Sequence, residues 1–179
     1  STPIEMMHFI ARLRELSGGK PTGFKLCIGH PWEWLAMVKA MLATGITPDF
    51  IVVDGAEGGT GAAPLEFTDH VGSPLQEGLL LVHNTLRGVG LRDRIKIGCA
   101  GKVVSAFDIA RLMALGADWC NSARGFMFAL GCLQAQTCHT GKGCFVTRGQ
   151  FALARNERGQ ALQLGAAQGR VQVGQAVVV

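Results

Sequence analysis

A glycine-rich loop directly after an apolar segment is the first feature of this sequence with chemical potential. Residues 50–54 read Phe-Ile-Val-Val-Asp, and residues 55–64 read Gly-Ala-Glu-Gly-Gly-Thr-Gly-Ala-Ala-Pro. Glycine permits positive φ and lets a flat or anionic ligand approach main-chain N–H groups. In α/β proteins, cofactors bind at the carboxyl ends of strands. The loop therefore favours a ligand site, although glycine-rich loops also serve as plain turns.

A lysine inside an apolar segment is the second candidate. Lys25 stands between Phe24 and Leu26. A lysine in a strand either extends into solvent at the strand end or points toward an anion. The glycine before this segment and the turn over residues 27–30 favour the second role. The ammonium would then face the electron-rich end of a flavin ring or a substrate carboxylate.

Two later junctions have the character of a phosphate site. Ala100-Gly101-Lys102 and Asn121-Ser122-Ala123-Arg124-Gly125 each follow an apolar segment and precede a helical pattern. Two such junctions in succession are typical of the phosphate site of a barrel, where helix N-termini and backbone N–H groups meet an anion. Together with the 55–64 loop they predict a ligand site.

Three cysteines have a spacing close to that of a metal or cluster site. Cys132, Cys138 and Cys144 are separated by five residues each. The alternatives are zinc with His139 as a further ligand, a three-iron cluster, or three unrelated thiols. Disulfides are not favoured, because the sequence shows no secretory signal. The remaining cysteines lie in strand-like segments and are expected to be small core residues: Cys27, Cys99 and Cys120.

The elements that would position these groups alternate between strands and helices. Short apolar segments predict strands over 23–28, 50–54, 94–99 and 119–122. Helical patterns cover residues 3–16, 31–44 and 125–136. Two further helices are expected: one has Ser73 as its N-cap with the Gln76 side chain reaching back to it, and the other begins at Ser105 and Asp108. This alternation implies an α/β fold with a parallel sheet, either an open sheet or half of an eight-stranded barrel.

Composition indicates a globular domain and limits its partners. The chain has 179 residues, of which 48% are hydrophobic and 17% charged. The net charge of +4 resides in residues 142–179, where it is too dilute to predict nucleic-acid binding. No apolar run reaches the length of a membrane span, and no signal peptide is evident, so a cytoplasmic protein is expected. The first residue is Ser, which suggests processing or a fragment.

The motifs occur in the order known from one family. Gly-Phe-Lys-Leu-Cys-Ile-Gly-His, Val-Asp-Gly-Ala-Glu-Gly-Gly-Thr-Gly-Ala-Ala-Pro, Gly-Leu-Arg-Asp-Arg-Ile, Ala-Arg-Gly-Phe-Met-Phe-Ala-Leu-Gly-Cys and Cys-His-Thr-Gly-Lys are all present. Over residues 1–141 the sequence resembles the FMN-binding synthase domain of the glutamate synthase family, especially its stand-alone members without an amidotransferase domain.

The resemblance implies a TIM-type (β/α)8 barrel, of which this chain holds the C-terminal half, with FMN and a [3Fe–4S] cluster. The implied activity is reductive amination of 2-oxoglutarate by ammonia and reduced FMN, an oxidoreductase reaction of the CH–NH2 class. An electron donor protein or an NAD(P)H-linked subunit would supply electrons. The implied catalytic residues are Lys25 and Glu57. The implied FMN-binding residues are Lys25, Gly58, Gly59, Thr60, Gly61, Gly101, Ala123, Arg124 and Gly125, and the cluster ligands are Cys132, Cys138 and Cys144.

Two departures from the family qualify these expectations. The spacing from Cys138 to Cys144 is one residue longer than in the family, and residues 142–179 form a divergent tail, for which disorder or a frameshifted reading is expected. A half barrel also exposes sheet edges, which predicts aggregation, dimerisation or incomplete folding without the missing half or a second copy. The alternatives are a related FMN barrel with another substrate and a truncated, non-catalytic remnant.

Overall fold

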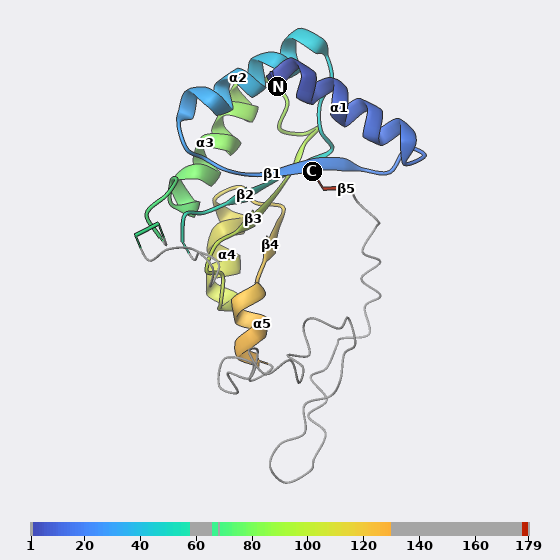
Figure 1. The fold of residues 1–179 in the computed structure, drawn as a ribbon. Helices are drawn as coiled ribbons and strands as arrows, with labels where there is room; N and C mark the ends of the chain where they lie inside the picture. The colour runs from blue at the N-terminus through green and yellow to red at the C-terminus, as the bar shows by residue number, and fades with distance from the viewer. Residues whose placement is uncertain (1, 58–65, 68, 130–176, 179) are drawn as a thin grey trace. The chain divides into compact units, whose positions relative to one another are not determined.

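The computed structural model of this chain describes residues 2–57, 66–67, 69–129 and 177–178 (Figure 1). The chain divides into a first unit, residues 1–123 with 174–179, and a second unit that begins at Arg124. The elements of the first unit are α1 (Pro3–Leu16), β1 (Thr22–Cys27), α2 (Pro31–Thr44), β2 (Phe50–Asp54), α3 (Leu75–Gly88), β3 (Lys96–Ala100), α4 (Ala106–Ala114), β4 (Trp119–Asn121) and β5 (Val177–Val178). Helix α5 (Ala123–Ala129) leads into the second unit.

All described strands pair in parallel, in the order β4-β3-β2-β1-β5. The α/β prediction with parallel βα units is therefore confirmed, and each of the four predicted strands lies within two residues of its expected bounds. Strand β5 comes from the segment assigned to a divergent tail, and it pairs with Thr22 and Gly23 at the start of β1. The tail assignment of residues 142–176 lies outside the described residues.

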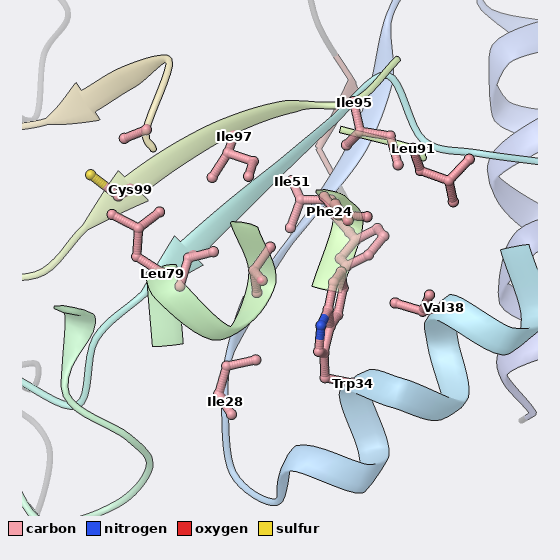
Figure 2. Close-up of a cluster of buried hydrophobic side chains, with 14 of the residues drawn as sticks. Phe24, Ile28, Trp34, Val38, Ile51, Leu79, Leu91, Ile95, Ile97 and Cys99 are labelled. Carbon is pink, nitrogen blue, oxygen red and sulfur yellow. The ribbon is translucent and has the colours of Figure 1, made fainter. Parts of the chain in front are cut away.

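The strand register separates the sheet into two faces. Because side chains alternate along each strand, Phe24, Ile51 and Ile97 share one face, and Lys25, Val52 and Gly98 share the other. The first face carries the buried core, which side chains from helices α1 to α4 complete (Figure 2). The second face carries the charged pair described below.

The core is large and apolar, as the composition predicts. Trp34 and Val38 of α2 pack with Phe24 of β1, and Ile51 of β2 and Leu79 of α3 belong to the same cluster (Figure 2). These side chains are at most 3% exposed. Burying a side chain of this size contributes about 1.5–3 kcal/mol, so the helix face holds most of the stability of the unit.

Aromatic rings cover part of the second face. The rings of Phe50 and Trp119 meet edge to face, with centroids 6.0 Å apart. Phe50 lies over Gly23 and Trp119 lies over Gly98, where an added Cβ would collide with the ring. Glycine at these two positions makes room for the rings.

Of two helix N-caps predicted from the sequence, one is confirmed and one is wrong. Ser105 and Asp108 form the expected capping box at α4. The prediction that Ser73 caps the next helix is wrong, because α3 begins after Pro74 and no side chain of its N-cap residue serves it. The backbone N–H of Ser73 instead donates to Ile28, and the capping group comes from a distant carboxylate.

Candidate functional site

Lys25 forms an ion pair at the carboxyl ends of β1 and β2. Its Nζ lies 2.5 Å from Oδ2 of Asp54. The register pairs Lys25 with Val52 and Cys27 with Asp54. Asp54 therefore lies on the neighbouring strand, on the same face as Lys25 and two residues nearer the carboxyl end. The side chains are 50% and 31% exposed. The anion that Lys25 contacts is thus a carboxylate of the chain itself, and its contact with a flavin or a substrate stays a prediction.

Cys27 is exposed, so the prediction that it is a small core residue is wrong. Its thiol lies against Gly72, where an added Cβ would collide with Sγ. Partial burial of the thiol raises its pKa, and the negative charges of Asp54 and Glu57 raise it further, while a backbone hydrogen bond from Ser73 opposes the rise. The thiol therefore stays protonated at neutral pH beside the ion pair.

Cys99 and Cys120 behave as predicted for core cysteines. They face each other in register on β3 and β4, and their Sγ atoms are 3.4 Å apart. Burial, followed by the hydrogen bond to Cys120, raises the pKa of Cys99 to about 12. The Cys99 thiol is therefore neutral, and it packs within the core.

Glu57 caps a helix that is distant in sequence. Both carboxylate oxygens accept from the backbone N–H of Leu75, at 3.0 and 2.9 Å. Leu75 is the first residue of α3, where unpaired N–H groups and the helix dipole favour a negative charge. The neighbouring Ala56 N–H donates to Ser73 at 3.0 Å. Two contacts thus fasten the start of the 55–64 loop to the start of α3.

The loops after β2 and β3 touch at two glycines. Gly55 N–H donates to the carbonyl of Ala100 at 2.8 Å. Gly101 has a φ of 142°, a conformation that L side chains rarely adopt, and a Cβ on it would lie 3.3 Å from the Gly55 nitrogen. The same Cβ would lie 3.4 Å from Glu57 Oε2. A side chain at position 101 would therefore strain the backbone and crowd both Gly55 and Glu57.

The structure describes only some of the other predicted site residues. Ala123, Arg124 and Gly125 form the first turn of α5, directly after Ser122, whose hydroxyl donates to the Val103 carbonyl at 2.8 Å. Seven predicted residues lie outside the described part of the chain: Gly58, Gly59, Thr60, Gly61, Cys132, Cys138 and Cys144. Among the described residues, no three His, Cys, Asp or Glu side chains gather as a metal site.

Asp54 is the residue that sequence reasoning missed. It ends the apolar run of β2 and precedes the glycine loop, which is the usual place for a functional group in a parallel sheet. Its proximity to Lys25 follows from strand pairing, which the sequence alone does not show. The chemistry available here is a paired ammonium and carboxylate, partly open to solvent, beside two backbone loops in close contact.

A second polar cluster occupies the opposite edge of the sheet. Arg92 donates to His83 Nδ1, to the carbonyls of Ile95 and Gly116, and to Asp118, at 2.9–3.1 Å. Asp118 also accepts from the Ile97 N–H at 2.7 Å. These groups satisfy one another's hydrogen bonds, and polar groups at this end of parallel βα units typically serve stability.

No helix in the described part of the chain combines the length and the apolar character needed to cross a membrane.

The chain is 47% identical over 140 residues to the glutamate synthase large subunit-like protein YerD of Bacillus subtilis, covering 78% of this chain and 26% of that protein. It is 39% identical over 123 residues to the archaeal-type glutamate synthase [NADPH] of Thermotoga neapolitana, covering 69% and 24%. The chain thus spans about a quarter of the length of these curated relatives.

Solved structures with partial likeness include a mutant of FabK from Thermotoga maritima. Its TM-score is 0.46 at 17% identity, covering 68% of this chain and 33% of that one. A mutant flavocytochrome b2 with pyruvate bound has a TM-score of 0.45 at 20% identity, covering 68% and 28%. The family described as "Conserved region in glutamate synthase" matches residues 1–151, and this chain therefore belongs to the glutamate synthase family.

Proposed function

We propose that this chain is part of a glutamate synthase-type oxidoreductase that binds FMN and reductively aminates 2-oxoglutarate to glutamate. The observation that supports this most directly is the Lys25 ammonium at the carboxyl edge of the sheet, next to the glycine contact between the loops after β2 and β3. Membership of the glutamate synthase family supports the class of reaction.

The described residues fit FMN at the carboxyl edge. Gly55 and Gly101 let the loops after β2 and β3 approach each other closely, because a Cβ at either position would crowd Glu57. A positive group such as the Lys25 ammonium suits the electron-rich end of the FMN ring. Lys25 would contact the ring or the substrate carboxylate. Gly101 and the turn from Ala123 to Gly125 would hold the phosphate, and residues 58–61 would complete the loop over the site.

The roles in the reaction follow from charge and position. Ammonia condenses with the ketone of 2-oxoglutarate and releases water, which yields the 2-imino acid. FMN, when bound and reduced, supplies the hydride that reduces the imino carbon. Lys25 binds and orients an anionic group, since an ammonium donates up to three hydrogen bonds. Glu57 holds the loop against α3 through Leu75; a catalytic role beyond this remains a prediction from the family resemblance.

Partners of the complete protein are part of the same proposal. The names of relatives specify NADPH in one case and ferredoxin in another, so we propose an electron donor of one of these kinds. The [3Fe–4S] cluster would require Cys132, Cys138 and Cys144. Because the chain spans about a quarter of its relatives, we propose that the rest of a barrel, or a second copy, completes the site.

The proposal is tested with the purified chain and with a longer protein that contains it. Bound FMN gives an absorbance maximum at about 450 nm, a property of the isoalloxazine ring. Chemically reduced FMN, 2-oxoglutarate and ammonia should yield glutamate, detected by mass spectrometry. A colourless longer protein that binds no FMN would refute the proposal. A yellow protein that makes no glutamate would favour a related FMN enzyme with another substrate. Iron and sulfide analysis tests the cluster separately.

A further inference from the structure

The Lys25–Asp54 pair places opposite charges side by side on one face of the sheet. The ammonium and the carboxylate are 2.5 Å apart, and the side chains remain 50% and 31% exposed. An ion pair with this much solvent contact stabilises a fold only slightly, because water screens the charges. The pair lies where burial decreases toward the carboxyl ends of the two strands, near the exposed Cys27. Stability therefore does not account for it.

The pair has the charge pattern that complements the head group of an α-amino acid. Such a head group carries a carboxylate and a positively charged nitrogen on one carbon. The carboxylate of such a ligand would accept a hydrogen bond from the Lys25 ammonium, and its nitrogen would donate one to the Asp54 carboxylate. Each charge of the ligand would then lie beside the opposite charge of the pair. Hydrogen bonds between charged groups are the strong ones, and two of them would fix the orientation of the ligand.

We propose that Asp54 is a specificity-determining residue that recognises the cationic nitrogen of an amino or imino acid, while Lys25 binds its carboxylate. This inference rests on the proposed function, in which the reacting species changes from an oxo acid to an imino acid to an amino acid. An oxo acid presents only a carbonyl oxygen to Asp54, which a carboxylate repels. The residue therefore favours the nitrogen-containing forms over the oxo acid.

The neighbouring groups leave this role to Asp54. Glu57 is another carboxylate at this edge, and both of its oxygens face the Leu75 N–H at the start of α3. The Cys27 thiol has a raised pKa and adds no negative charge at neutral pH. Of these three groups, Asp54 alone presents a negative charge to a ligand that contacts Lys25.

A simpler role for Asp54 makes the opposite prediction. If Asp54 served only as a counter-ion for Lys25, its removal would free the ammonium and tighten the binding of every anion. The two roles differ in whether the effect depends on the ligand nitrogen. Two probes of similar size that differ in that group, L-glutamate and 2-oxoglutarate, separate them.

The experiment uses the longer protein that contains this chain, loaded with FMN. Calorimetry measures its affinity for each probe, first in the wild type and then in the variants. In Asp54→Asn we expect a loss of about tenfold in affinity for L-glutamate, as for one charge-assisted hydrogen bond in a half-exposed site. Affinity for 2-oxoglutarate should stay equal or rise. Lys25→Met should weaken both probes. Asp93→Asn, an exposed position at the opposite edge, is the matched control and should change neither.

Equal changes for both probes in Asp54→Asn would overturn the inference, and so would a longer wild-type protein that binds FMN but neither probe. Should Asp54→Asn fail to fold, Asp54→Glu keeps the charge and should retain the preference for L-glutamate, so its loss would also overturn the inference. If the protein forms glutamate but Asp54→Asn leaves the ratio of the affinities for L-glutamate and 2-oxoglutarate unchanged, only the role of Asp54 is refuted. If that ratio changes as expected but no glutamate forms, only the proposed function is refuted.

Discussion

Removing the Glu57 carboxylate should loosen the start of α3. Both oxygens accept from the Leu75 N–H, and the N-cap residue Pro74 offers no side chain to replace them. Loss of a helix cap costs about 0.5–2 kcal/mol, and loss of a negative charge at a helix N-terminus costs about 0.3–1 kcal/mol. Since Glu57 is only partly buried, we expect Glu57→Ala to lower the free energy of unfolding by about 1–2 kcal/mol.

Two measurements test this expectation. Urea denaturation gives the free energy of unfolding, and amide hydrogen exchange reports Leu75 directly, where about 1.4 kcal/mol corresponds to a tenfold faster exchange. Glu57→Gln keeps an acceptor oxygen and should lose about half as much stability. Glu66→Gln removes the same charge from an exposed position and serves as the control. Unchanged Leu75 exchange in Glu57→Ala would refute the capping role, whatever the total stability.

Three further outcomes follow from other contacts. Gly98→Ala should destabilise the unit by about 1–3 kcal/mol, because a Cβ there collides with the Trp119 ring; an unchanged urea midpoint would contradict this. Arg92→Lys should cost about 1–3 kcal/mol, since a lysine cannot reproduce four separate hydrogen bonds; full stability of the variant would show that the cluster is dispensable. Hydrogen bonds from Ser105 lower the pKa of Asp108, so its contribution is present above the unfolded pKa of about 3.9 and is lost as pH falls through the lower folded value. In Asp108→Asn, the free energy of unfolding should therefore fall less steeply as the pH drops below about 4. An identical pH dependence in the variant would argue against the capping box.

Much of the fold could be predicted from local pattern. Short apolar segments and helical periodicity placed four parallel strands within two residues of their bounds, because burial on one face imposes its period on the sequence. The capping box of Ser105 and Asp108 was also predictable, since both partners lie within one turn. The N-cap assigned to Ser73 was wrong because a distant carboxylate, Glu57, competes for the same helix end.

The candidate site was predictable only in part. Lys25 stood out as a charge in an apolar strand, and the glycine loop stood out through its composition. Asp54 looked like the ordinary polar end of a strand, and Cys27 looked like a core residue. Their true environments depend on which face each strand turns toward the helices, and a one-residue change of register would exchange the faces.

The sequence by itself determined the family, the alternation of strands and helices, and the residue types available for chemistry, because these depend on neighbours along the chain. The tertiary structure decided which of these residues meet. Pairing of β1 with β2 brought Asp54 to the Lys25 ammonium, and packing of α3 brought Leu75 to the Glu57 carboxylate. Electrostatic and hydrogen-bond contacts act over a few ångströms. Residues far apart in the chain acquire a joint function only when the sheet and its helices set that distance.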